Sequence, residues 1–136
     1  MGLAERRAVK EFQDKSYPGL KADIEKAAGF PVPIEVSWDQ LAKEDYATSY
    51  DEFWKKVYFQ PLIAALKKIT RDDIGRDAIK DGLKQITLTN TKGAYSAESA
   101  ISFAGGELVI DHDPATNVDY IDDRTEHLIK ILERAL

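Results

Sequence analysis

Two adjacent glycines between two alternating apolar segments constrain the fold of this chain more than any other feature. Gly105 and Gly106 can adopt the positive φ angles that both central positions of a two-residue hairpin turn require. Such a turn pairs the flanking residues as Ala104 with Glu107, Phe103 with Leu108, Ser102 with Val109 and Ile101 with Ile110. The hydrophobic pairs then lie on one face, so the turn and the apolar pattern both predict a hairpin.

Helical spacing of apolar residues predicts two helices at the start of the chain. We expect a break between them at 17–19, where the sequence reads Tyr-Pro-Gly, and an end of the second helix at Gly29. Ile34, Val36 and Trp38 then alternate with polar residues, which predicts a short strand.

Two sequences of the form Ser/Thr-x-x-acid predict the starts of the next two helices. Ser49-x-x-Glu52 is expected to open a helix to about residue 69, kinked or restarted at Pro61. Thr70-x-x-Asp73 is expected to open a helix to about residue 85.

The remaining elements complete a mixed domain. Ile86 and Leu88 predict a strand, and the apolar side of residues 121–136 predicts a final helix. Because every predicted strand has one apolar and one mostly polar face, the sheet should be covered by helices on one side only. The sequence therefore predicts one α+β domain over residues 1–136. Its two layers would be an antiparallel sheet of about four strands and helices on one face, in the order ααβααβββα.

Composition excludes several classes of protein. The 136 residues are 43% apolar and 32% charged, which is typical of a folded domain. The chain has no cysteine, so disulfides and thiolate metal sites are excluded. No apolar run approaches the length of a membrane span and the first residues lack the apolar core of a signal peptide, so a cytoplasmic protein is expected.

Acidic residues concentrate near the end of the chain. From Ile86 to Leu136 there are four basic and nine acidic residues, a difference of five that equals the whole net charge of −5. Such a surface repels nucleic acid and attracts a basic protein partner. Carboxylates near a helix start also stabilise that helix, which is the purely structural alternative. The candidate contact residues are Asp111, Asp113, Asp119, Asp122, Asp123 and Glu126.

The same carboxylates do not form a recognisable metal site. Asp111-x-Asp113 resembles the opening of a calcium loop, but Ala115 and Thr116 occupy its third acidic position and its required glycine. His112 and His127 lie among carboxylates without the spacing of a known ligand pattern. No metal and no other cofactor is expected, since the glycine fingerprint and the phosphate-loop lysine are also absent.

A second candidate surface is an aromatic stripe. Tyr50, Trp54 and Tyr58 recur every four residues along the predicted helix that begins after Ser49. Partly exposed tryptophan and tyrosine are favoured contact residues in interfaces, whereas buried ones only fill a core. Both interpretations are open from the sequence.

No catalytic motif is present. The nucleophile-elbow pattern G-x-S-x-G does not occur, and adjacent carboxylates such as Asp122 and Asp123 point to different sides of a helix. The function that the sequence favours is therefore a non-enzymatic protein-interaction domain that uses the acidic surface or the aromatic helix. The alternative is a small enzyme whose site is assembled only by folding.

Overall fold

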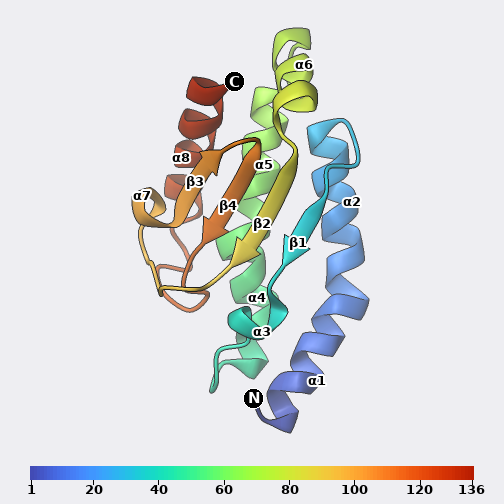
Figure 1. The fold of residues 1–136 in the computed structure, drawn as a ribbon. Helices are drawn as coiled ribbons and strands as arrows, with labels where there is room; N and C mark the ends of the chain where they lie inside the picture. Colours follow the sequence, from blue (N-terminus) through green and yellow to red (C-terminus); the bar gives the residue numbers. More distant parts are fainter.

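Four strands form a single sheet in the computed structural model, which describes residues 1–136 (Figure 1). Their spatial order is β1-β2-β4-β3. The predicted α+β class with four strands is confirmed, and no helix is both long and apolar enough to cross a membrane. The strands are β1 (Ile34–Val36), β2 (Gln85–Thr89), β3 (Ile101–Ala104) and β4 (Glu107–Asp111).

The hairpin of β3 and β4 has the predicted register. Ile101 pairs with Ile110 and Ala104 pairs with Glu107 across an antiparallel ladder. Gly105 and Gly106 have φ angles of 59° and 82°, as the two-residue turn requires. This prediction is confirmed, and the hairpin places the apolar side chains of both strands on the face that the helices cover.

The prediction of a wholly antiparallel sheet was wrong. β1 pairs with β2 in parallel, and β2 pairs with β4 in parallel, so only the hairpin is antiparallel. The long helical connection from β1 to β2 returns the chain to the same end of the sheet, as a parallel pair requires. Alternation failed to reveal this because it reports which face of a strand is buried and carries no information on strand direction.

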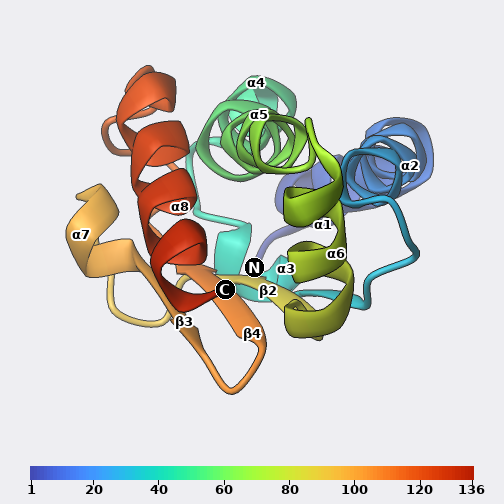
Figure 2. The same cartoon turned by 90° about the horizontal axis from the view of Figure 1, so that it is seen from above.

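Helices cover one face of the sheet, as predicted (Figure 2). β4 alternates between buried and partly exposed side chains, and β2 does so as far as Leu88, so most of the opposite face is open; Thr89 is buried and bonded to Gln40. The longer helices are α1 (Leu3–Glu11), α2 (Tyr17–Ala28), α5 (Gln60–Ile69), α6 (Asp73–Gly82) and α8 (Ile121–Ala135); the short ones are α3 (Trp38–Leu41), α4 (Tyr50–Trp54), α7 (Ala97–Ala100) and the 3₁₀ turn η2 (Ala47–Ser49).

Two π-helical segments replace the expected break and kink. Segment η1 (Phe12–Ser16) joins α1 to α2, and segment η3 (Lys55–Phe59) joins α4 to α5. Each ends two residues before a proline, Pro18 or Pro61, which lies in the first turn of the next helix. A proline ring clashes with the carbonyl group four residues earlier in a regular α-helix, and a wider turn relieves that clash.

The two predicted capping boxes do not form. Ser49 has φ −107° and ψ −2°, which is not the extended conformation of a capping residue, and its side chain makes no cap bond. The Thr70 hydroxyl donates instead to the carbonyl oxygens of Ala27 and Leu66, each at 2.8 Å. Asp72 caps α6 by accepting a 2.8 Å hydrogen bond from the Gly75 N–H.

Two predicted boundaries were also misplaced. Trp38 begins α3 and is not part of β1. Helix α6 ends at Gly82, three residues before the predicted end, and Gln85 is the first residue of β2. The pairing of β1 with β2 extends to Val36, so α3 begins after it, and the pairing of β2 with β4 begins at Gln85, so α6 ends before it.

Candidate functional site

The aromatic stripe lies inside the molecule. Tyr50, Trp54 and Tyr58 are at most 2% exposed. The Tyr50 ring stacks on Trp54 at 4.5 Å between centroids, and Phe12 meets Trp54 edge-on at 4.9 Å. Burial raises the pKa of the Tyr50 hydroxyl to about 12, with smaller contributions from nearby carboxylates. Of the two interpretations that the sequence left open, the structure supports core packing, because the stripe is buried and contacts Phe12 of η1, and it offers no exposed contact face.

The first two residues of the acidic group are held by neighbouring loops. The Asp111 carboxylate accepts hydrogen bonds from the backbone N–H and the hydroxyl of Thr91, the former at 2.7 Å. Asp113 forms a 3.0 Å ion pair with Lys43 and accepts a 2.8 Å bond from the Ala115 N–H. Burial alone would raise the pKa of Asp113, but these two contacts outweigh it and the pKa lies below its ordinary value. Both side chains therefore have structural partners.

The remaining acidic residues differ in how they are paired. Asp119 lies 2.8 Å from the Lys56 ammonium group. Asp122, Asp123 and Glu126 are exposed on the first turns of α8 and have no ion-pair partner. The structure thus brings the predicted acidic residues to one end of the molecule but leaves only those on α8 free to meet a partner.

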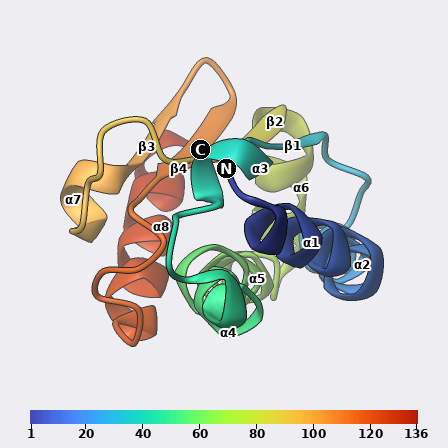
Figure 3. The same ribbon diagram turned by 90° about the horizontal axis from the view of Figure 1, so that it is seen from below.

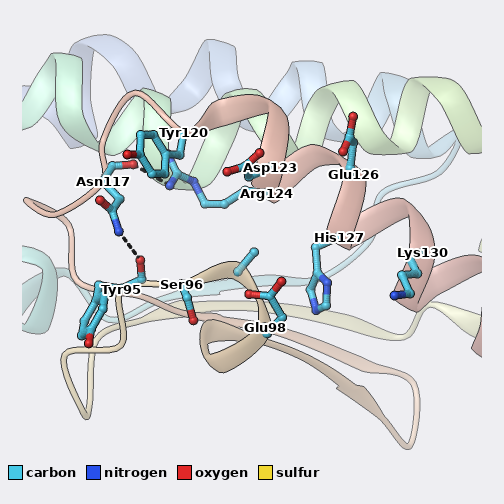
Figure 4. Close-up of a pocket in the computed structure, with 11 residues that line it drawn as sticks. Tyr95, Ser96, Glu98, Asn117, Tyr120, Asp123, Arg124, Glu126, His127 and Lys130 are labelled. Atoms are coloured by element: carbon cyan, nitrogen blue, oxygen red, sulfur yellow. Dashed lines mark hydrogen bonds between the residues drawn. The ribbon is translucent and has the colours of Figure 1, made fainter.

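A hollow of about 410 Å³ lies between α7 and α8. We call it the α7–α8 hollow; its walls come from residues 95–98 and from residues 117–130 (Figure 4). These two segments follow β2 and β4, whose carboxyl ends lie side by side because the two strands are parallel (Figure 3). The carboxyl edge of parallel strands is where sheets of mixed α and β structure commonly bind their ligands.

Arg124 fixes one wall of the hollow. This residue is 2% exposed and has no carboxylate partner. Its guanidinium group donates to the backbone carbonyl oxygens of Asn117 at 2.8 Å, Val118 at 2.7 Å and Lys56 at 3.2 Å. Burial lowers the pKa of Arg124, and the three carbonyl dipoles compensate for part of the lost hydration. The residue therefore holds the loop before α8 against η3.

Asn117 links the two walls. Its backbone has φ 53°, in the left-handed region, and its side-chain amide donates a 2.6 Å hydrogen bond to the Tyr95 carbonyl oxygen (Figure 4). A non-glycine residue keeps such a conformation only where its surroundings stabilise it, and asparagine does so most readily. The hollow is therefore bounded by a loop of defined shape.

Three carboxylates and two basic side chains line the hollow. Glu98, Asp123 and Glu126 line it and have no ion-pair partner, whereas the Arg124 guanidinium is already bonded to carbonyl groups. Lys130 and His127 also line the hollow. Tyr95 and Tyr120 also line the hollow and are 63% and 57% exposed. Carboxylates beside exposed aromatic rings are suited to a cationic ligand.

Ser96 is the one serine that lines the hollow, and its hydroxyl group is already hydrogen-bonded to Ser99. Ser96 caps α7 by accepting a 3.3 Å bond from the Ser99 N–H, and its hydroxyl donates to the Ser99 hydroxyl at 2.9 Å. His127 and Glu98 face each other from α8 and α7 across the hollow (Figure 4). The lining thus contains an imidazole and a carboxylate, but its serine is bonded to another serine.

Sequence reasoning missed most of this site. Asp123 and Glu126 were predicted as contact residues, while Tyr95, Glu98 and Tyr120 were not. The missing signal was the parallel order of β2 and β4, which brings 95–98 beside the start of α8. Comparison of the chain with models of protein families, with curated proteins and with solved structures gives no match.

Proposed function

We propose that this protein is a non-enzymatic interaction domain that binds a basic segment of a partner protein at the α7–α8 hollow. The observation that carries the proposal is that Glu98, Asp123 and Glu126 line a hollow without any ion-pair partner of their own. Structural carboxylates in this chain, such as Asp111 and Asp113, have hydrogen-bond or ion-pair partners within the fold.

The chemistry of the hollow favours lysine or arginine side chains. A carboxylate can accept hydrogen bonds from an ammonium or guanidinium group, and Tyr95 and Tyr120 offer ring faces to the same cation. Each such contact contributes about 0.5–1 kcal/mol where solvent reaches it. Several contacts are therefore needed, and a basic segment supplies more of them than a single residue does. The excess negative charge also accelerates association at low salt.

The proposal is tested with a fluorescein-labelled octalysine peptide and its binding measured by fluorescence anisotropy. We expect Glu98→Gln with Asp123→Asn to weaken binding about tenfold, a loss of about 1.4 kcal/mol. The matched control is Asp122→Asn with Glu133→Gln, which removes the same charge from exposed residues that do not line the hollow. The control should change affinity less than about threefold, as expected for exposed charges.

Two outcomes would contradict the proposal. If both double variants weaken binding equally, the peptide responds only to net charge and the hollow has no role. If the wild-type protein binds octalysine no better at about 50 mM than at about 300 mM salt, the carboxylates do not take part at all, because exposed ion pairs weaken as salt rises.

A small enzyme is the second candidate, favoured by the His127 imidazole and the Glu98 carboxylate on opposite walls of the hollow. These groups are of the types that act as general acid and base. Hydrolysis of p-nitrophenyl acetate and p-nitrophenyl phosphate by the wild-type protein, lost in His127→Gln, would support this function. Equal background rates in both proteins would count against it.

A further inference from the structure

His112 is a buried imidazole at the end of β4. It is 0% exposed, and its Nδ1 lies 2.6 Å from the backbone carbonyl oxygen of Asp113. Because a carbonyl oxygen only accepts, Nδ1 carries the proton and donates it. The second ring nitrogen, Nε2, is buried and has no hydrogen-bond partner among the protein groups. The neutral ring therefore fits this position.

The backbone around His112 joins four parts of the fold. The His112 N–H donates to the Thr89 carbonyl oxygen at the end of β2, at 3.0 Å. The His112 carbonyl oxygen accepts a 2.5 Å bond from the Tyr58 hydroxyl of η3. The next residue, Asp113, donates its N–H to the Ala94 carbonyl oxygen at 2.7 Å. Residues 112–120, which we call the latch loop, thus begin at a junction held by neutral groups.

Protonation of the imidazole would place a second positive charge in a buried site that already holds the Arg124 guanidinium, and only the Asp113 carboxylate and carbonyl oxygen would favour it. Arg124 of α8 is itself a buried cation whose guanidinium holds the latch loop at Asn117 and Val118. Tyr58 of η3 contributes a neutral hydroxyl. The two nearby carboxylates, Asp111 and Asp113, are already bonded to Thr91 and to Lys43.

We propose that His112 is a pH-sensitive latch: its neutral ring keeps the latch loop closed against β2 and η3, and its protonation opens the loop. Asn117 and Tyr120 of this loop line the α7–α8 hollow, so opening of the loop would remove part of one wall. The latch itself goes beyond the proposed binding function, and its test does not depend on a partner.

The direction of the effect follows from proton binding. Burial is the main cause that lowers the pKa of His112 below its usual 6.5, and the Arg124 charge lowers it further; the carbonyl oxygen and the carboxylate of Asp113 oppose this shift without reversing it. The open loop, with the ordinary pKa, binds more protons than the closed loop, so closure is complete above about pH 6.5 and weakens as the pH falls. Each pH unit below that value multiplies the ratio of open to closed loop about tenfold, until the pKa of the closed form is reached.

The experiment is amide hydrogen exchange on the intact protein, followed by NMR between about pH 7 and pH 5 and corrected for intrinsic exchange rates. The amides of Asp113 and Tyr120, which donate to Ala94 and Asn117, should lose protection about tenfold per pH unit below 6.5. The amides of Gly29 and Thr70, which donate within α2 and α5, serve as references and should stay protected.

Two variants assign the effect to His112. His112→Asn keeps a side-chain N–H donor but cannot titrate, so the pH dependence of Asp113 and Tyr120 protection should vanish. His127→Asn removes the other histidine and should preserve the pH dependence. If the protection of these amides falls equally with decreasing pH in His112→Asn and in the wild type, His112 does not control the loop and the proposal is wrong.

A measurement on the wild-type protein keeps the proposal testable should His112→Asn fail to fold. Imidazole NMR should show the His112 ring with its proton on Nδ1 and a midpoint below 6.5. A ring that titrates at or above 6.5 while the Asp113 amide stays protected would overturn the proposal.

Discussion

The hydroxyl of Tyr58 and the backbone carbonyl oxygen of His112 are joined by a buried hydrogen bond of 2.5 Å. Burial raises the pKa of the Tyr58 hydroxyl well above its ordinary value, so it remains a donor throughout the range in which proteins are stable. The bond connects η3 to the end of β4 and so links the helical layer to the sheet.

Tyr58→Phe should lower the free energy of unfolding by about 1–3 kcal/mol, because it leaves a buried carbonyl group without a donor. Urea denaturation measures the change. Tyr46→Phe is the control, since the Tyr46 side chain is exposed and its loss of a hydroxyl should cost less than about 0.5 kcal/mol. Equal losses in the two variants would show that the buried bond contributes nothing.

The hairpin turn gives a second prediction. Gly105 and Gly106 both have positive φ, and a Cβ on Gly106 would lie 2.6 Å from Cγ of Lys84. Replacing both by valine should cost about 2 kcal/mol or more, since β-branched residues resist this conformation. Gly105→Asn should cost less than about 1 kcal/mol, because asparagine tolerates it. A double-valine variant with an unchanged denaturation midpoint would be incompatible with this turn.

Two helical glycines should respond in opposite directions to alanine. A Cβ on Gly19 meets no atom within 4 Å, so Gly19→Ala should stabilise α2 by about 0.5–1 kcal/mol. A Cβ on Gly75 would lie 1.7 Å from the backbone oxygen of Ile69, so Gly75→Ala should displace the start of α6 and cost about 1–3 kcal/mol. Thermal unfolding followed by circular dichroism compares the two, and changes of the same sign would contradict this packing.

Metal ions should not stabilise the fold. The carboxylates of Asp111 and Asp113 are bonded to Thr91, Ala115 and Lys43, and a cation would have to displace those contacts. We therefore expect the melting temperature to be the same with excess chelator and with calcium, magnesium or zinc. A rise of several degrees with one of these ions would reveal a site that the sequence and these contacts do not predict.

The sequence predicts this fold well where local chemistry decides the structure. The Gly105-Gly106 turn determines the register of β3 and β4 on its own, and Gly29 ends α2 with φ 86°. The sequence predicts the fold poorly where contacts between residues far apart in the chain determine the structure. The pairing of β1 with β2 is parallel because of the path of the helices between them, and Thr70 fails to cap α6 because its hydroxyl contacts Ala27.

The candidate site shows the same division. Asp123 and Glu126 were predictable because acidic residues near a helix start are exposed and close together. Tyr95 and Glu98 were not, since they reach the hollow only through the parallel pairing of β2 and β4. The sequence also could not show that Trp54 is buried, because the helical spacing of an aromatic stripe does not reveal which other elements pack against it.

The π-helical segment η3 has a consequence for how the length of this chain can vary. Tyr50, Trp54, Tyr58, Leu62 and Leu66 are all buried at a constant spacing of four residues. In a regular α-helix four residues turn about 40° past a full rotation, so this stripe would wind about 160° around the axis. The wider turn at Lys55–Phe59 accommodates the extra residue and brings the stripe back to one side. Segment η3 is therefore a place in the helical layer where one residue can be lost without turning the buried side chains that follow it toward solvent.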